Sequence, residues 1–185
     1  EDCSQRCFFP NGFSFYCYAA KLFDSSVEFE DLKKDYFTHA YGDQWETVLA
    51  YLEEVDKRMP QTYMEAKHTA RVKSNFYKPE MEQTLLSMVP VSQEYEEKFA
   101  QHKNMPHRVQ TVAMRLMRRH AQYTQGLAKV MAIKCLGKDA EAKEAADKFF
   151  DEFGRYELEM ERYYDHMLMC HAMHVIFNTK AEYAQ

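Results

Sequence analysis

Residues 106–137, PHRVQTVAMRLMRRHAQYTQGLAKVMAIKCLG, form the stretch that decides the fold. Pro106 suits the first turn of a helix, where its missing N–H group is not needed. Gly137 suits the end of that helix, where a left-handed residue is common. Between them the apolar residues recur mostly at steps of three and four: Val109, Val112, Ala113, Leu116, Met117, Tyr123, Leu127, Val130 and Met131. The stretch therefore predicts one long amphipathic helix.

A second stretch with the same pattern begins at Asp139, directly after the glycine. Its apolar stripe is Ala142, Ala146, Phe149, Phe153, Tyr156, Met160, Tyr163, Met167 and His174. Both stripes are heptad-like over several turns, as at the contact between helices of a bundle. Because the link between the stretches is short, we expect antiparallel neighbours. The predicted fold is all-α, an antiparallel helical bundle with two long C-terminal helices.

The composition supports a helical chain. Glycine and proline are scarce, with 5 of each among 185 residues, about 5% against an average of roughly 12%. This excludes collagen-like and low-complexity chains, and it disfavours sandwiches and barrels, whose strands need frequent turns. No uncharged apolar run approaches the roughly 18 residues of a membrane span, so we expect no membrane partner. A net charge of −5 gives no case for a nucleic-acid partner.

Capping patterns predict shorter helices upstream. Three Ser/Thr/Asp residues are each followed three positions later by Glu: Ser25 with Glu28, Asp43 with Glu46, and Thr62 with Glu65. In such a pair the first side chain accepts free N–H groups of the first turn, and the Glu reaches back to the cap. Gly42 suits the end of the first of these helices. We therefore assign residues 25–185 to the helical bundle.

The first 24 residues differ from the rest by their aromatic side chains: Phe8, Phe9, Phe13, Phe15, Tyr16, Tyr18 and Phe23. A Pro-Asn-Gly turn at residues 10–12 precedes a stretch, residues 13–23, that predicts a helix apolar around most of its circumference. Such a helix must be covered on several sides. We therefore treat residues 1–24 as a separate segment and expect that a neighbour of this helix is missing from the chain.

The start of the chain and its cysteines bear on processing and compartment. The chain begins Glu1-Asp2-Cys3 without an initiator Met or a signal segment, so we expect a processed chain or a fragment. Five cysteines without a C-x-x-C pair disfavour a zinc ribbon. The odd, unpatterned set favours reduced thiols and a cytoplasmic location, with a disulfide between Cys3 and Cys7 left open.

Charge is distributed unevenly along the two long helices. No Asp or Glu lies between Lys98 and Lys138, whereas the stretch from residue 139 to residue 165 is rich in both. A basic helix beside an acidic one indicates an intramolecular electrostatic match. The rival hypothesis is an anion-binding face, made of Arg115, Arg118, Arg119 and His120. Because His120 interrupts the apolar stripe, we expect it to be buried and hydrogen-bonded to a Glu or Tyr of the acidic helix.

Metal and catalytic sites are not indicated. Glu65 and His68 have the i, i+3 spacing of di-iron bundles, but only one copy occurs. His171 and His174 lie one turn apart without a third strong ligand. A metal bundle built from these four residues is the weaker hypothesis, and we expect no metal and no cofactor. The chain also lacks a Gly-rich phosphate loop, a G-x-S-x-G elbow and an H-E-x-x-H motif.

Two stretches carry a resemblance to a known family. Residues 7–16, CFFPNGFSFY, lead on to Leu22-Phe23-Asp24, and residues 35–42, DYFTHAYG, are followed by VLAYL at residues 48–52. Together they resemble the bacterial family called domain of unknown function 4838, found in proteins classed as glycoside hydrolases. In that family a helix after a Pro-x-Gly turn leads to a Tyr-Phe-x-x-x-Tyr/Phe-Gly segment and a long helical region. The motifs cover about residues 7–60.

The resemblance implies that residues 1–24 are the last strand–helix unit of a (β/α)8 barrel whose remainder is absent. Active sites of such barrels lie at the C-terminal ends of the strands, so Asp2, Gln5 and Arg6 would bind the glycan. The family's catalytic carboxylates have no matching positions here. The resemblance thus implies a C-terminal domain, inactive alone, that supports the barrel of a carbohydrate-active enzyme. The alternative is a free-standing helical bundle that binds a protein or an anionic ligand.

Overall fold

The computed structural model of the chain describes residues 8–60, residue 63 and residues 76–170. In these residues the chain forms helices and no strand. The helices are α1 (Phe13–Phe23), α2 (Phe29–Tyr41), α3 (Trp45–Arg58), α6 (Glu82–Ala100), α7 (Arg108–Cys135), α8 (Asp139–Gly154) and α9 (Glu157–Met160). Short 3-10 helices, Gly42–Gln44 and Pro79–Met81, precede α3 and α6. The predicted all-α bundle is confirmed.

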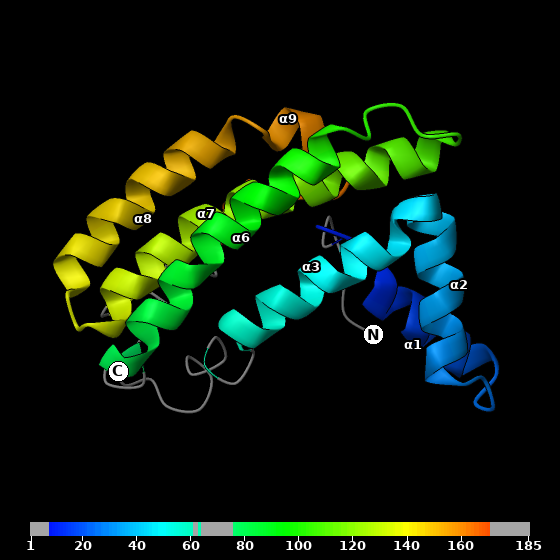
Figure 1. Cartoon of the computed structure of the whole chain (residues 1–185), viewed down its shortest axis with the longest axis horizontal. Coiled ribbons are helices and arrows are strands. Elements are labelled where there is room, and N and C mark those ends of the chain that lie inside the picture. Colours follow the sequence, from blue (N-terminus) through cyan, green and yellow to red (C-terminus); the bar gives the residue numbers. More distant parts are fainter. Residues whose placement is uncertain (1–7, 61–62, 64–75, 171–185) are drawn as a thin grey trace.

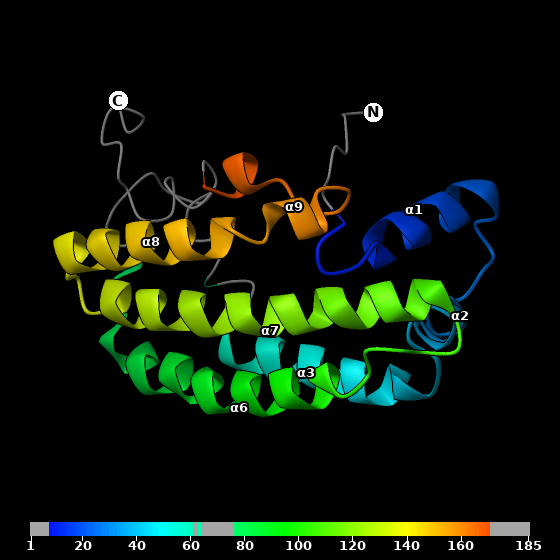
Figure 2. The ribbon, with the colours of Figure 1, turned by 90° about the horizontal axis from the view of Figure 1, so that it is seen from above.

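Helix α7 is the centre of the molecule. Figure 2 shows α8 and α9 on one side of it and α3 and α6 on the other. Successive helices α6, α7 and α8 run antiparallel, whereas α2 crosses one end of α7 instead of lying alongside it (Figure 1). Because α7 is covered on two sides, half of its 28 residues are buried. Its predicted span, from just after Pro106 to just before Gly137, is confirmed.

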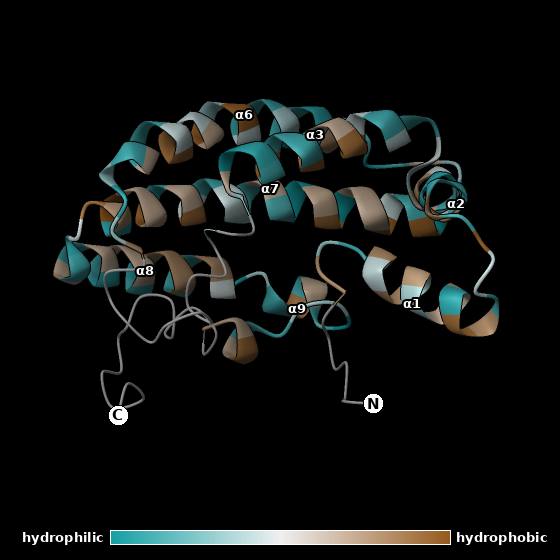
Figure 3. Cartoon of the chain, turned by 90° about the horizontal axis from the view of Figure 1, so that it is seen from below, coloured by the Kyte–Doolittle hydropathy of each residue, from teal (hydrophilic) through white to brown (hydrophobic). Residues whose placement is uncertain are grey.

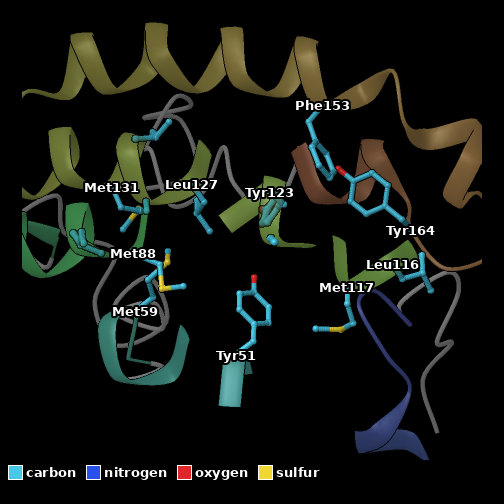
Figure 4. Close-up of a cluster of buried hydrophobic side chains, with 14 of the residues drawn as sticks. Tyr51, Met59, Met88, Leu116, Met117, Tyr123, Leu127, Met131, Phe153 and Tyr164 are labelled. Atoms are coloured by element: carbon cyan, nitrogen blue, oxygen red, sulfur yellow. The ribbon is translucent and has the colours of Figure 1, made fainter. Parts of the chain in front are cut away.

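The core lies along both sides of α7. Figure 4 shows large side chains meeting there from several helices, among them Tyr51 of α3, Met88 of α6, Leu127 of α7 and Phe153 of α8. Gly126 of α7 lets α8 approach closely, because a Cβ atom at this position would lie 2.1 Å from the ring of Phe149. Methionines fill the spaces between the larger groups, as unbranched side chains do well.

The helix ends agree with the sequence pattern in part. Gly42 and Gly137 follow helices and have φ of 59° and 76°, which non-glycine residues rarely adopt. The predicted start at Ser25 is wrong, because α2 begins at Phe29 without a side-chain cap. Instead, the carboxylate of Asp24 accepts hydrogen bonds from the backbone N–H and the hydroxyl of Ser26, which forms a turn before the helix.

The second long helix is shorter than its apolar stripe predicts. α8 ends at Gly154, and after α9 the chain turns before residues 166–170 become helical again. The ring of His166 folds back over the end of α8, where a Cβ atom on Gly154 would lie 2.7 Å from Nε2. This turn allows Met160 and Tyr164 to be buried in the core.

The aromatic N-terminal segment packs on the bundle over its described residues. Helix α1 spans Phe13–Phe23 as predicted. The ring of Phe9, which precedes it, contacts aromatic rings of α7, α8 and the chain after α9: His120, Tyr123, Phe153 and Tyr164. Phe9 thus joins the N-terminal segment to the core.

Candidate functional site

The exposed side of α1 is the first candidate surface. This helix buries none of its residues. Its exposed fractions are 94% for Phe23, 70% for Leu22 and 51% for Tyr18. Together with Phe15 and Ala19 these side chains line a shallow pocket on the surface. We call these five residues the α1 face.

Contacts with α2 fix the direction in which this surface points. The backbone N–H of Gly12 donates to Tyr36 Oη at 2.8 Å, and the hydroxyl of Tyr16 donates to the carboxylate of Asp35. The ring of Phe13 packs against that of Phe37, with centroids 5.2 Å apart. Since these contacts occupy the inner side of α1, its apolar residues on the other side face away from the bundle, and Figure 3 shows α1 at the edge of the molecule.

The three arginines of the predicted anion site are brought together, and all three form ion pairs within the chain. Arg119 binds Glu159 at 2.6 Å and Arg115 lies 3.6 Å from the same carboxylate. Arg118 lies 3.7 Å from Glu96. Glu159 belongs to the acidic stretch that the sequence indicates as the partner, but Glu96 lies on α6. The charges of this face are therefore balanced by two neighbouring helices.

Arg119 is the most buried of the three, with 14% of its side chain exposed. Its guanidinium lies 3.7 Å from the centroid of the Tyr156 ring and donates to Gln122 Oε1 at 2.8 Å. Stacking of this kind suits the planar guanidinium and not a lysine. Arg119 thus fastens the turn after α8 to α7.

His120 is half-buried and hydrogen-bonded, but its partner lies on a different helix from the one predicted. Its Nδ1 lies 2.9 Å from the hydroxyl of Tyr51 on α3, whereas the sequence placed the partner on the acidic helix. Burial lowers the pKa of His120 to about 4, because the charged imidazolium is poorly solvated there. Its ring packs against the rings of Phe9, Tyr51 and Tyr123, an aromatic setting that does not extend an anion site.

Several predicted site residues lie outside the described part of the chain. They are the proposed glycan residues Asp2, Gln5 and Arg6, the proposed metal ligands Glu65, His68, His171 and His174, and the cysteines Cys3 and Cys7. Among the residues that the structure describes, no group of three or more His, Cys, Asp or Glu side chains is arranged to hold a metal ion. None of the described helices has both the length and the apolar character needed to cross a membrane.

The sequence did not predict one contact between a thiol and an imidazole. Cys170 Sγ lies 3.4 Å from His166 Nε2. The i, i−4 spacing of Cys170 and His166 is the signal in the sequence that places both on one helix face.

Comparison with known proteins finds no family model, no curated protein and no solved structure that matches this chain.

Proposed function

We propose that the chain is a non-catalytic helical domain that attaches to a neighbouring protein domain through the α1 face. The observation that carries this proposal is a helix with no buried residue, on which the aromatic and aliphatic residues of the α1 face point away from its own bundle. Contiguous exposed apolar surface of this kind marks interaction sites more often than scattered single residues do.

The resemblance described above supplies the identity of the neighbour. In the family it resembles, the helix after the Pro-x-Gly turn belongs to a barrel, and the helical region follows it. We therefore infer that the α1 face covers the barrel of a carbohydrate-active enzyme, and that the bundle supports this barrel beside its glycan site. In this arrangement the barrel carries out catalysis, and the helical domain supports the barrel.

The bundle offers a rigid support for such a surface. α1 is tied to α2 by Tyr36 and Tyr16, and Phe9 anchors the preceding turn in the core. A partner that packs on Leu22 and Phe23 would thus be coupled to the core by Phe9 and α2. Removing these two side chains from water would contribute about 1.5–3 kcal/mol each.

The test uses the complete reading frame that encodes this chain. We expect a barrel-length segment before Glu1, and the proposal is wrong if an initiator Met directly precedes Glu1. In the complete protein, changing Leu22 and Phe23 to Gln should expose the junction to limited proteolysis. The matched control is Leu158→Gln, which alters another highly exposed leucine, 85% accessible, on α9. Equal protease sensitivity of both variants and the native protein would contradict the role of α1.

The alternative, binding of an anionic partner at the three arginines, is less well supported. Each arginine already pairs with a carboxylate of the chain, so an anionic ligand would have to displace these contacts.

A further inference from the structure

Three side chains near the end of the described chain form a hydrogen-bonded relay. Cys170 Sγ lies 3.4 Å from His166 Nε2, and Tyr164 Oη lies 3.0 Å from His166 Nδ1. Thiol and imidazole lie one turn apart on one helical segment, residues 166–170. Cys170 and His166 are half-buried, whereas Tyr164 is buried. The order of the three groups is that of a nucleophile, a base and a residue that orients the base.

The end of α8 also packs against the imidazole. Its Nε2 atom lies over Gly154, at a position that leaves no room for a side chain there. The backbone N–H of His166 donates to Glu157 Oε1 at 3.3 Å. When Nδ1 carries the proton and donates to Tyr164, Nε2 is the free acceptor that faces the thiol. Gly154 and Tyr164 thus fix the ring with its acceptor toward Cys170.

The surroundings keep the thiol protonated at rest. Burial, and then the negative charges of Asp151 and Glu157, raise the pKa of Cys170. Since the thiolate is the nucleophile, reaction requires a base that removes the proton during attack, and His166 is placed to do so. The same two carboxylates attract a cationic reagent and repel an anionic one.

We propose that Cys170 is a base-assisted reactive thiol that undergoes exchange with small cationic disulfides. Sγ of Cys170 attacks one sulfur of the disulfide, so that a new S–S bond forms and the original S–S bond breaks. His166 Nε2 accepts the thiol proton and returns it to the departing thiolate. Cys170 is oxidised to a mixed disulfide and the leaving sulfur is reduced to a thiol. This thiol site is separate from the α1 face.

In the test the intact chain reacts with cystamine, a cationic disulfide. Peptide mass spectrometry measures the modified fraction of each cysteine over time. Cys17 is the matched control, because it is also half-buried, and burial also raises its pKa. At pH 7 we expect Cys170 to react at least about tenfold faster than Cys17, a threshold set below the roughly 10²- to 10⁴-fold that a positioned base supplies. Equal rates at the two cysteines would overturn the proposal.

Two variants test the relay itself. His166→Gln removes the base, and Gly154→Ala places a methyl group where the imidazole lies, so both should lower the rate at Cys170 to that at Cys17. Cys135 is buried, and its modification therefore reports unfolding of a variant. If one of the two variants unfolds, the rate at Cys170 in the other variant tests the role of His166. A rate at Cys170 that is unchanged in a folded variant contradicts the role of His166.

Two further measurements distinguish a base-assisted reaction of Cys170 from a rate set only by the exposure of its thiol. Replacing cystamine by the anionic dithiodiglycolate should slow Cys170 more than Cys17, and added salt should reduce this difference. Tyr164→Phe should shift the pH profile of the Cys170 rate, because Nδ1 loses its partner. A pH profile identical to that of Cys17, or no discrimination by charge, would count against the site.

Discussion

The hydroxyl of Tyr51 on α3 lies 2.9 Å from Nδ1 of His120 on α7, inside the core. The same hydroxyl lies 3.1 Å from Oγ1 of Thr124, which itself donates to the backbone carbonyl of His120. Because the Thr124 proton is already used, Tyr51 must donate to Thr124 and accept from His120. The three contacts are satisfied together only when Nδ1 carries the proton. The half-buried imidazole is therefore a neutral donor that ties α3 to α7.

Tyr51→Phe tests this chain of hydrogen bonds. The change keeps the ring but leaves the N–H group of His120 without an acceptor in a buried site. We expect the free energy of unfolding to fall by about 1–3 kcal/mol, measured by urea denaturation at pH 7. Tyr18→Phe is the control, because Tyr18 is half exposed, and it should change the stability by less than about 0.5 kcal/mol. Equal effects of the two changes would contradict the assigned hydrogen bonds.

Acid should destabilise the fold through His120. Its pKa is lowered to about 4, whereas an unfolded histidine has a pKa near 6.5. The unfolded state therefore binds more protons between these values, and stability falls as the pH decreases from about 6.5 to 4. The groups around the ring are Tyr51, Thr124, Phe9 and Tyr123, and none of them carries a charge that could offset the imidazolium.

The full loss at His120 is on the order of 3 kcal/mol at pH 4. Urea titrations at pH 7 and pH 5 measure the part of this loss that falls between these two values, roughly 2 kcal/mol. His120→Gln is the comparison, because glutamine keeps an N–H donor without titrating. The variant should lose less stability than the native chain between the two pH values. Parallel losses in both proteins would assign the acid sensitivity to other groups.

Gly126→Ala should destabilise the contact between α7 and α8. The new methyl group would overlap the Phe149 ring, and overpacking of this kind costs about 1–3 kcal/mol, although alanine is the better helix former. Phe149→Ala in the same chain removes the clash. The double variant should therefore be more stable than the sum of the two single changes predicts, as thermal unfolding can show. Additive losses would mean that the cost of Gly126→Ala does not come from the Phe149 ring.

Local features of the fold could be predicted from the sequence, and contacts between distant segments could not. Helix α1 and the glycines at positions 42 and 137 follow from short-range pattern and backbone conformation. The close packing of the His166 ring on Gly154 joins residues twelve positions apart, and no local pattern predicts it. Likewise, burial of His120 demands a partner, but only the packing of α3 on α7 makes that partner Tyr51.

The ion pair between Lys134 and Asp139 should respond unequally to the loss of either member. Lys134 is 1% exposed and lies 2.5 Å from Asp139, whose side chain is 37% exposed. Asp139→Asn leaves a buried ammonium without its counter-charge, at a cost of about 2–4 kcal/mol. Lys134→Met leaves a carboxylate that water and the N-terminus of α8 still stabilise, so its cost should be smaller. Urea denaturation of both variants checks the order, and the reverse order would contradict it.

Reversal of three charges on α7 distinguishes an intramolecular role of the arginines from anion binding. In the variant with Arg115, Arg118 and Arg119 changed to Glu, each new carboxylate faces Glu159 or Glu96. We expect a stability loss on the order of 1–3 kcal/mol, mostly at the well-buried Arg119, since exposed pairs contribute little. The loss should shrink in high salt.

The control for this reversal is Lys129→Glu, which changes an exposed charge on the same helix and should leave stability within about 0.5 kcal/mol. Adding Glu159→Arg to the triple variant should restore part of the lost stability, because opposite charges face each other again. Urea denaturation in low and high salt measures both effects. If the triple variant keeps its native stability but no longer binds an acidic polymer that the native chain binds, the arginines serve an external anion and not α9.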